Sequence, residues 1–203
     1  ELIHPLMESL ENIRQRTTHV IGLPTGFTKL DELTSGLQKG DFIIVGARPG
    51  QGKTAIALNL ATHVGLALKK PVAIFSLEMR KQAILLRMLC AEARVDAQKL
   101  RRGFLERERF GDITSAASRF LESDIYIDDA AGLTCLDLRS RARRLASELR
   151  LQNKELALVI VDYLQLLRHG ERSENRQQEV SEISRSLKAL AQDLDVPLVA
   201  LSQ

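Results

Sequence analysis

The sequence predicts an α/β fold with a mostly parallel sheet flanked by helices. Three observations lead to this prediction: apolar runs of strand length recur along the chain, segments of helical period lie between them, and a Gly-rich turn follows the first run. Strands that alternate with helices form parallel sheets with right-handed crossovers. A chain of 203 residues with 44% apolar side chains is long enough to bury such a core within one domain.

The individual elements follow from this pattern in chain order. Strands are expected at 41–47, 71–78, 123–129, 156–162 and 196–203. Their continuous apolar character is typical of parallel strands that are buried on both faces. Helices are expected at 54–68, 81–93, 109–121 and 133–153. Thr134, with Asp137 three residues later, predicts a capping box at the start of the last of these helices.

Composition and charge argue against several other classes of protein. The net charge of +3 is spread over many acidic and basic residues, so bulk charge alone does not indicate a nucleic-acid-binding protein. Cys90, Cys135 and the four histidines lack the spacing of metal ligands, and we interpret the cysteines as core residues in a reducing compartment. Because no apolar run is long enough for a membrane span and the first residues do not resemble a signal peptide, we expect a cytoplasmic protein without membrane contact.

The Gly-rich turn GARPGQGKT at 46–54 fits the relaxed P-loop pattern, in which a small residue, here Ala47, precedes Gly-Lys-Thr by five positions. Amide groups at a helix N-terminus favour an anion, and Gly50 and Gly52 allow backbone shapes and a close approach that a Cβ would block. Lys53 is expected to reach the β- and γ-phosphates of ATP, and Thr54 to coordinate Mg²⁺. The residues expected to bind the nucleotide are Ala47, Arg48, Pro49, Gly50, Gln51, Gly52, Lys53, Thr54 and Ala55.

Polar residues follow other strands at the sheet edge where ligands of such folds bind. Asp162 comes after four consecutive aliphatic residues and is expected to orient Mg²⁺. Glu78 is the candidate catalytic residue that positions or deprotonates the attacking water; alternatively, it caps the helix beginning near Arg80 or pairs with Arg80. Gln203 is a candidate sensor of the γ-phosphate, unless it is only a surface terminus.

Asp128 and Asp129 end the strand predicted at 123–129, and we interpret them as turn residues at the strand exit rather than as catalytic groups. The Arg-rich stretch at 139–144 lies on an expected amphipathic helix and is interpreted as a solvated or subunit-facing side. Four strands deliver polar residues to the edge that carries the Gly-rich turn, namely Glu78, Asp128 with Asp129, Asp162 and Gln203, and this convergence predicts nucleotide binding more strongly than the turn alone.

Four segments extend this pattern over nearly the whole chain: GLPTGFTKLDELTSGLQKGDFIIVGARPGQGKTAIALNLA, IFSLEMR, LVIVDYLQLL and NRQQEVSEISRSLKALAQDLDVPLVALSQ. Together they resemble the RecA-type motor domain of the DnaB family of hexameric replicative DNA helicases. The first segment alone would suggest the broader RecA/KaiC-like class. SLEM, VDYLQL and EISRSLKALA point to the helicase branch.

The resemblance implies a RecA-like P-loop NTPase that hydrolyses ATP with Mg²⁺ and translocates along single-stranded DNA as a homo-hexamer. Lys53 and Thr54 match the family's P-loop, Glu78 its catalytic glutamate, Asp162 its Walker B aspartate and Gln203 its phosphate- and DNA-coupling motif. In this family an adjacent subunit completes each site with an arginine finger. Primase and a helicase loader are further partners that the resemblance implies.

Two departures from the family pattern affect this interpretation. Ala47 replaces the first glycine of the P-loop, which the relaxed pattern permits. The family continues beyond Gln203 and carries a separate N-terminal domain, so we expect this chain to be a fragment, and no residue here is assigned as the arginine finger. Arg168, Arg172 and Arg176 match the position of the family's central-channel loop; they either contact the DNA backbone or belong to a mobile surface loop.

The N-terminal stretch 1–16 has apolar residues at helical spacing, and the polar residues after it suggest a hinge. We therefore divide the chain into a linker helix with its hinge, 1–21, and an ATPase domain truncated on its C-terminal side, 22–203. The resemblance favours docking of the helix on the adjacent subunit; the alternative is that it folds back on its own domain.

The function that these features predict is that of an ATP hydrolase coupled to DNA unwinding, the motor domain of a hexameric replicative helicase. One alternative is a RecA/KaiC-like recombination or switch protein in which ATP controls assembly. Another is a nucleotide-binding scaffold without hydrolysis, against which the presence of Glu78 and Asp162 argues.

Overall fold

The computed structural model describes residues 20–162 and 176–202. The predicted linker helix at 1–16 and the site candidates Arg168, Arg172 and Gln203 lie outside these residues. Arg176 is the first residue of a helix, but its side chain also lies outside the described part.

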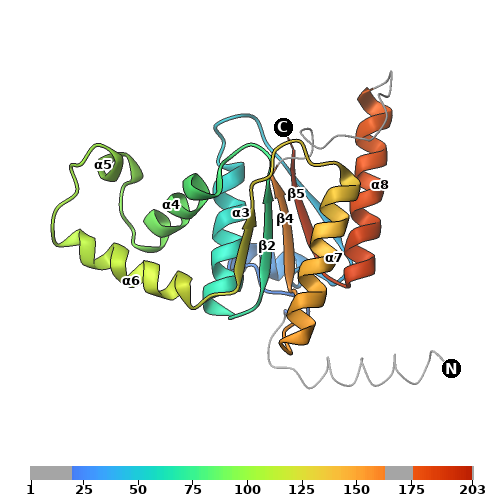
Figure 1. The fold of residues 1–203 in the computed structure, drawn as a ribbon, viewed down its shortest axis with the longest axis horizontal. Coiled ribbons are helices and arrows are strands. Elements are labelled where there is room, and N and C mark those ends of the chain that lie inside the picture. Colours follow the sequence, from blue (N-terminus) through green and yellow to red (C-terminus); the bar gives the residue numbers. More distant parts are fainter. Residues whose placement is uncertain (1–19, 163–175, 203) are drawn as a thin grey trace.

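The described chain forms one five-stranded sheet in which all neighbouring strands are parallel, in the order β1-β5-β4-β2-β3 (Figure 1). The strands are β1 Phe42–Gly46, β2 Val72–Ser76, β3 Ile125–Asp128, β4 Leu158–Asp162 and β5 Leu198–Ser202. The predicted parallel α/β class is confirmed. Each strand is slightly shorter than predicted, so Glu78 lies two residues beyond the end of β2 rather than at the end of the strand.

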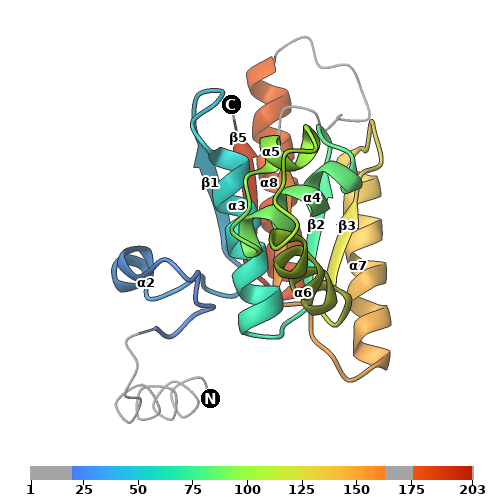
Figure 2. The same cartoon turned by 90° about the vertical axis from the view of Figure 1, so that its left-hand side faces the viewer.

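Helices cover both faces of the sheet, as Figures 1 and 2 show from two directions. One face carries α3 Lys53–Thr62 and α4 Lys81–Glu92, and the other carries α7 Cys135–Leu151 and α8 Arg176–Leu194. The short helix α2 Thr28–Thr34 precedes β1, and α5 Ala97–Arg101 and α6 Arg109–Leu121 follow α4. Among the described helices, none combines the length and the apolar character that a bilayer span requires.

The central strands alternate their side chains between two apolar cores. In β4, Val159 and Val161 pack with α7 and α8, whereas Leu158 and Ile160 pack with α3 and α4. Successive side chains of a strand point to opposite faces, so the next even position continues toward α3. That position is Asp162, and the strand thereby directs its carboxylate to the first turn of α3.

Three local features differ from the sequence expectation. Ile44 of β1 is 52% exposed, because β1 lies at the edge of the described sheet rather than in its middle. The helix predicted at 54–68 changes at its end into a π-helical turn, η1 His63–Ala67, where Gly65 approaches Ile125 so closely that a Cβ would lie 2.4 Å from the isoleucine side chain. Helix α8 was not predicted, although its buried residues recur at helical spacing.

The segment from α4 to α6, residues 81–121, projects from the body of the domain (Figure 1). We refer to it as the α4–α6 extension. It has a small apolar core of its own, formed by buried Ala93, Val95 and Ala116. Ile84 and Met88 of α4 are buried in the apolar core on the α3 face of the sheet, and Phe120 near the end of α6 packs against the same core.

The predicted capping box of α7 is present and provides a test of the fold. The Asp137 amide donates to the Thr134 hydroxyl at 3.1 Å, and the Thr134 amide donates to the Asp137 carboxylate at 3.0 Å. Thr134→Ala removes the first bond and should destabilise the domain by about 1 kcal/mol. Thermal unfolding should show a Tm lower by about 2–4 °C. Thr114→Ala, at an exposed position within α6, is the matched control and should change Tm less; equal Tm values for the two variants would contradict the role of the cap.

Candidate nucleotide and magnesium site

The turn between β1 and α3 has the backbone conformation that its glycines were expected to permit. Gly50 and Gly52 both adopt left-handed φ values, 80° and 86°, which side chains rarely tolerate. Gly52 is the N-cap residue of α3, which begins at Lys53. A Cβ at either glycine would meet no protein atom within 4 Å, so the space above the turn is open. The first amides of a helix have no acceptor within it, and here they border that open space.

Thr54 and Asp162 meet at the carboxyl edge of the sheet. The Thr54 hydroxyl donates a hydrogen bond of 3.1 Å to Oδ2 of Asp162. Lys53 and Asp162 are only 7% and 4% exposed. The second carboxylate oxygen of Asp162, Oδ1, is buried and receives no hydrogen bond from the described residues. The structure therefore brings together the three residues that the sequence assigned to phosphate and Mg²⁺.

The electrostatic environment of Asp162 reflects its burial. Desolvation raises the pKa of the Asp162 carboxyl above its usual range, and the hydrogen bond from Thr54 and the charge of Lys53 partly oppose this effect. Glu78 raises the pKa further, and the Arg87 guanidinium lowers it. Arg87 lies on α4 and was not singled out in the sequence, because a lone arginine within a helix pattern gives no signal of a site.

The residues at this edge fit a magnesium ion bound together with a phosphate chain. Mg²⁺ prefers oxygen ligands, keeps several waters and is usually held by one or two carboxylates together with substrate phosphates. Thr54 and Asp162 offer a hydroxyl and a buried carboxylate oxygen, and the start of α3 favours an anion beside them. No group of three or more His, Cys, Asp or Glu side chains suited to a metal occurs among the described residues.

Glu78 lies in the loop between β2 and α4, beside the end of β4. The Leu77 amide donates to the Asp162 carbonyl at 2.7 Å, and the Met79 amide donates to the Ser76 hydroxyl at 3.1 Å. The Glu78 side chain between these two bonds is exposed. Within the described residues its carboxylate makes no hydrogen bond or ion pair, so neither helix capping nor pairing with Arg80 accounts for it. A carboxylate held near Asp162 and open to solvent can accept a proton from water.

The other polar candidates have contacts of their own. Asp128 accepts a hydrogen bond from the Ala130 amide at 3.0 Å and pairs with Arg141 at 2.8 Å, as expected for a turn residue. Arg143 pairs with Asp193, and Arg144 with Glu148. The Arg-rich stretch of α7 is thus largely neutralised within the domain; its interpretation as a solvated or subunit-facing side stays a prediction.

Ser202 at the end of β5 lies opposite Gly46, and its carbonyl accepts the Ala47 amide at 3.3 Å. The end of β5 thus lies next to the start of the Gly-rich turn. The sequence analysis assigned Gln203, the next residue, to sensing the γ-phosphate; this remains a prediction, because Gln203 lies outside the described residues.

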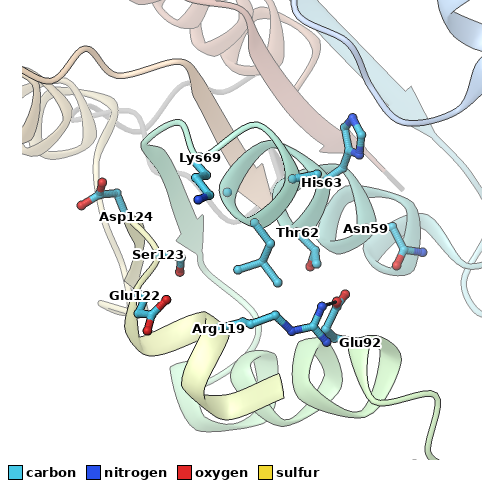
Figure 3. A pocket seen from close by; sticks show the side chains of 12 residues that line it. Asn59, Thr62, His63, Lys69, Glu92, Arg119, Glu122, Ser123 and Asp124 are labelled. Atoms are coloured by element: carbon cyan, nitrogen blue, oxygen red, sulfur yellow. Dashed lines mark ion pairs between the residues drawn. The ribbon is translucent and has the colours of Figure 1, made fainter. Parts of the chain in front are cut away.

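A cavity of about 580 Å³ lies at the opposite end of α3 (Figure 3). Its wall includes Thr62 and His63 from the end of α3 and the start of η1, and the Arg119–Glu92 ion pair at 2.6 Å links α6 to α4 beside it. None of the predicted site residues contributes to this wall. We therefore place the candidate site at the start of α3 and not in this cavity.

Comparison with known proteins shows the family to which the chain is similar. A family model described as DnaB-like helicase C terminal domain matches residues 22–203. The chain is 50% identical over 197 residues to the replicative DNA helicase DnaB of Geobacillus stearothermophilus and 48% identical over 197 residues to the replicative DNA helicase DnaC of Bacillus subtilis. These matches cover 97% of this chain and 42% of each relative, so the chain spans less than half the length of these relatives.

Solved structures give the same result for the fold. The ATPase domain of G40P superposes with a TM-score of 0.89 at 33% identity, covering all of this chain and 71% of that one. A DnaB-like replicative helicase, described together with its interactions with primase, superposes with a TM-score of 0.87 at 33% identity and covers all of this chain and 48% of that one. The RecA-like fold expected from the sequence is confirmed by these neighbours.

The burial of Asp162 leads to a test on the protein without nucleotide. Because desolvation raises the pKa of this carboxyl, the unfolded chain releases the proton more readily, and ionisation above the usual carboxyl pKa costs folding stability. Asp162→Asn removes this cost and should raise Tm at pH 7, with about 2–4 °C expected per kcal/mol gained. The gain should disappear as the pH falls below the usual carboxyl pKa, where both states are protonated. A lower Tm for Asp162→Asn at pH 7 would contradict the conclusion that the ionised Asp162 carboxylate lowers folding stability.

Proposed function

Since the chain belongs to the family of DnaB-like helicase C-terminal domains, we propose that it is the ATP-hydrolysing motor of a hexameric replicative DNA helicase. The observation that carries this proposal is the hydrogen bond between Thr54 and the buried Asp162 at the start of α3, with the exposed Glu78 in the adjoining loop. The identity of 50% to a replicative helicase favours this function over a RecA/KaiC-like switch.

The proposed roles follow the chemistry of each side chain. Lys53 binds the β- and γ-phosphates of ATP, and the backbone of the Gly-rich turn surrounds the phosphate chain. Thr54 and Asp162 hold Mg²⁺, which when bound neutralises negative charge on the phosphates. Glu78 orients the attacking water and accepts its proton. Gln203 senses the γ-phosphate, and a neighbouring subunit supplies the arginine that stabilises charge in the transition state.

The proposed partners belong to the assembled protein. We propose a homo-hexamer in the cytoplasm that translocates on single-stranded DNA, with Arg168, Arg172 and Arg176 contacting the DNA backbone. Residues 1–16 serve as an assembly helix that docks on the adjacent subunit. A primase partner is supported by the similar helicase whose structure is described with its interactions with primase. A helicase loader follows from the family resemblance alone.

Lys53→Ala and Glu78→Gln should separate nucleotide binding from chemistry in the full-length hexamer. Lys53→Ala removes a contact to the ground-state phosphates and should abolish productive ATP binding. Glu78→Gln keeps the shape of the side chain but cannot take a proton, so ATP binding should persist while kcat falls by about 10²–10⁴-fold. Nucleotide titration and phosphate release measure the two effects. Glu106→Gln, an exposed position between α5 and α6, is the control; turnover by Glu78→Gln equal to that control would remove Glu78 from the catalytic role.

The DNA-binding proposal is tested by the triple replacement of Arg168, Arg172 and Arg176 by Ala in the hexamer. Binding of single-stranded DNA should weaken without sequence preference, and the slope of log K against log salt should decrease by about 0.7 for each lost phosphate contact. A second triple variant controls for net charge by replacing exposed arginines of the α4–α6 extension, Arg101, Arg102 and Arg107. If both triple variants show the same slope, the loop makes no specific phosphate contacts.

A further inference from the structure

The loop that carries Glu78 joins β2 to α4, and its first half is fixed by the sheet. Leu77 is tied to the carbonyl of Asp162, and Met79 to the side chain of Ser76, by hydrogen bonds of 2.7 and 3.1 Å. Ser76 is itself buried at the end of β2. These bonds set the start of the loop but leave its other end, where α4 begins, to be fixed by a separate contact.

Helix α4 takes its N-terminal cap from a distant segment. Arg80 is its N-cap residue, with extended backbone at φ −68° and ψ 145°, but the Arg80 side chain makes no capping bond. Instead, Oδ2 of Asp129 accepts the Lys81 amide at 2.9 Å, across 48 residues of sequence. A carboxylate at a helix N-terminus satisfies an amide that has no acceptor in the helix and interacts favourably with the helix dipole.

The segment that holds Asp129 is anchored independently of α4. Asp128 lies opposite Phe75 in the pairing of β3 with β2, and its side chain is bound by Arg141 and by the Ala130 amide. Asp129 is therefore attached to the edge of the sheet next to the strand that leads to Glu78. The loop from Ser76 to Lys81 is held at one end by β4 and at the other by the exit of β3.

We propose that Asp129 is a positioning residue for Glu78: by capping α4 at Lys81 it fixes the far end of the loop that presents the carboxylate to the attacking water. This inference rests on the proposed catalytic role of Glu78. The hydrogen bond of Asp129 goes to Lys81 and not to Lys53, Thr54 or Asp162, so its loss is expected to leave nucleotide binding at the Gly-rich turn intact. A reacting group displaced by about 1 Å can lose about 10²-fold in rate, so a loosened loop is expected to lower kcat alone.

The test compares Asp129→Ala with Asp129→Asn in the full-length hexamer. Asp129→Ala should lower kcat by at least about 10-fold with ATP affinity unchanged within about 2-fold. Asp129→Asn retains an oxygen acceptor for the Lys81 amide and should recover most of the turnover. The matched control is Asp96→Ala, which removes a carboxylate cap of α5, bonded to the Gln98 and Lys99 amides at 2.7 and 3.2 Å, within the same extension. Turnover of Asp129→Ala equal to that of Asp96→Ala would overturn the proposal.

Removing the donor of this hydrogen bond, the Lys81 amide, provides a second, independent test. Lys81 is the first residue of α4, a position that accepts proline, and the extended backbone of Arg80 suits a following proline. Lys81→Pro removes the amide hydrogen and should lower kcat as Asp129→Ala does, whereas Lys81→Ala keeps the amide and should not. The double variant Lys81→Pro with Asp129→Ala should lose no more than either single variant, because both remove one bond. Additive losses would overturn the proposal.

A further double variant distinguishes failure of this inference from failure of the proposed function. If Asp129 acts through Glu78, adding Asp129→Ala to Glu78→Gln should change kcat by less than about 2-fold. If Glu78→Gln alone turns over normally, the catalytic role of Glu78 is wrong, and Asp129 has no group to position. If Glu78→Gln is inactive while Asp129→Ala is normal, only the positioning role is wrong. Sedimentation and Tm of each variant show that the hexamer is assembled and folded.

Discussion

Thr54 and Asp162 are 108 residues apart in the sequence, and the hydrogen bond between them holds the first turn of α3 against the end of β4. The bond requires that β4 lie in the sheet with its even positions facing α3, and that the Gly-rich turn place the helix directly above the strand. The order of the strands, their register and the left-handed backbone of Gly50 and Gly52 are all needed for this hydrogen bond to form. The neighbouring strand then brings the loop of Glu78 to the same point, because the Leu77 amide is bound to the carbonyl of Asp162 itself.

Burial of the Asp162 carboxylate lowers the folding stability of the protein when no ligand is bound. A carboxylate with one oxygen that receives no hydrogen bond from the described residues opposes folding, as its raised pKa indicates. The apolar cores on the two faces of the sheet offset this cost. A metal ion bound at Oδ1 of Asp162 would supply a partner for this oxygen and would thereby offset part of the cost.

Much of this site could be predicted because its signals are local in the sequence. The Gly-Lys-Thr turn and the aspartate after four aliphatic residues each indicate their chemistry without knowledge of the fold. The role of Asp129 could not be read in this way, because a capping carboxylate 48 residues from its helix becomes visible only when β3 pairs with β2. Arg87 is a similar case, since its effect on Asp162 depends on how α4 packs against α3. The exposure of Ile44 and the π-helical turn at His63 also depend on neighbours that a strand or helix pattern does not specify.

The small separate core of the α4–α6 extension gives the domain regions of unequal stability. Among the described residues, this small core is formed by buried Ala93, Val95 and Ala116, whereas Ile84 and Met88 of α4 and Phe120 of α6 pack with the core on the α3 face of the sheet. Segments with few buried contacts open at a lower free-energy cost than the rest of a protein, so α5 and the start of α6 form a flank that can deform while the sheet remains intact. A macromolecule that binds to this flank can displace it with a small loss of folding free energy. Glu78 lies at the other end of α4, in the loop that is hydrogen-bonded to β4 and to the segment after β3.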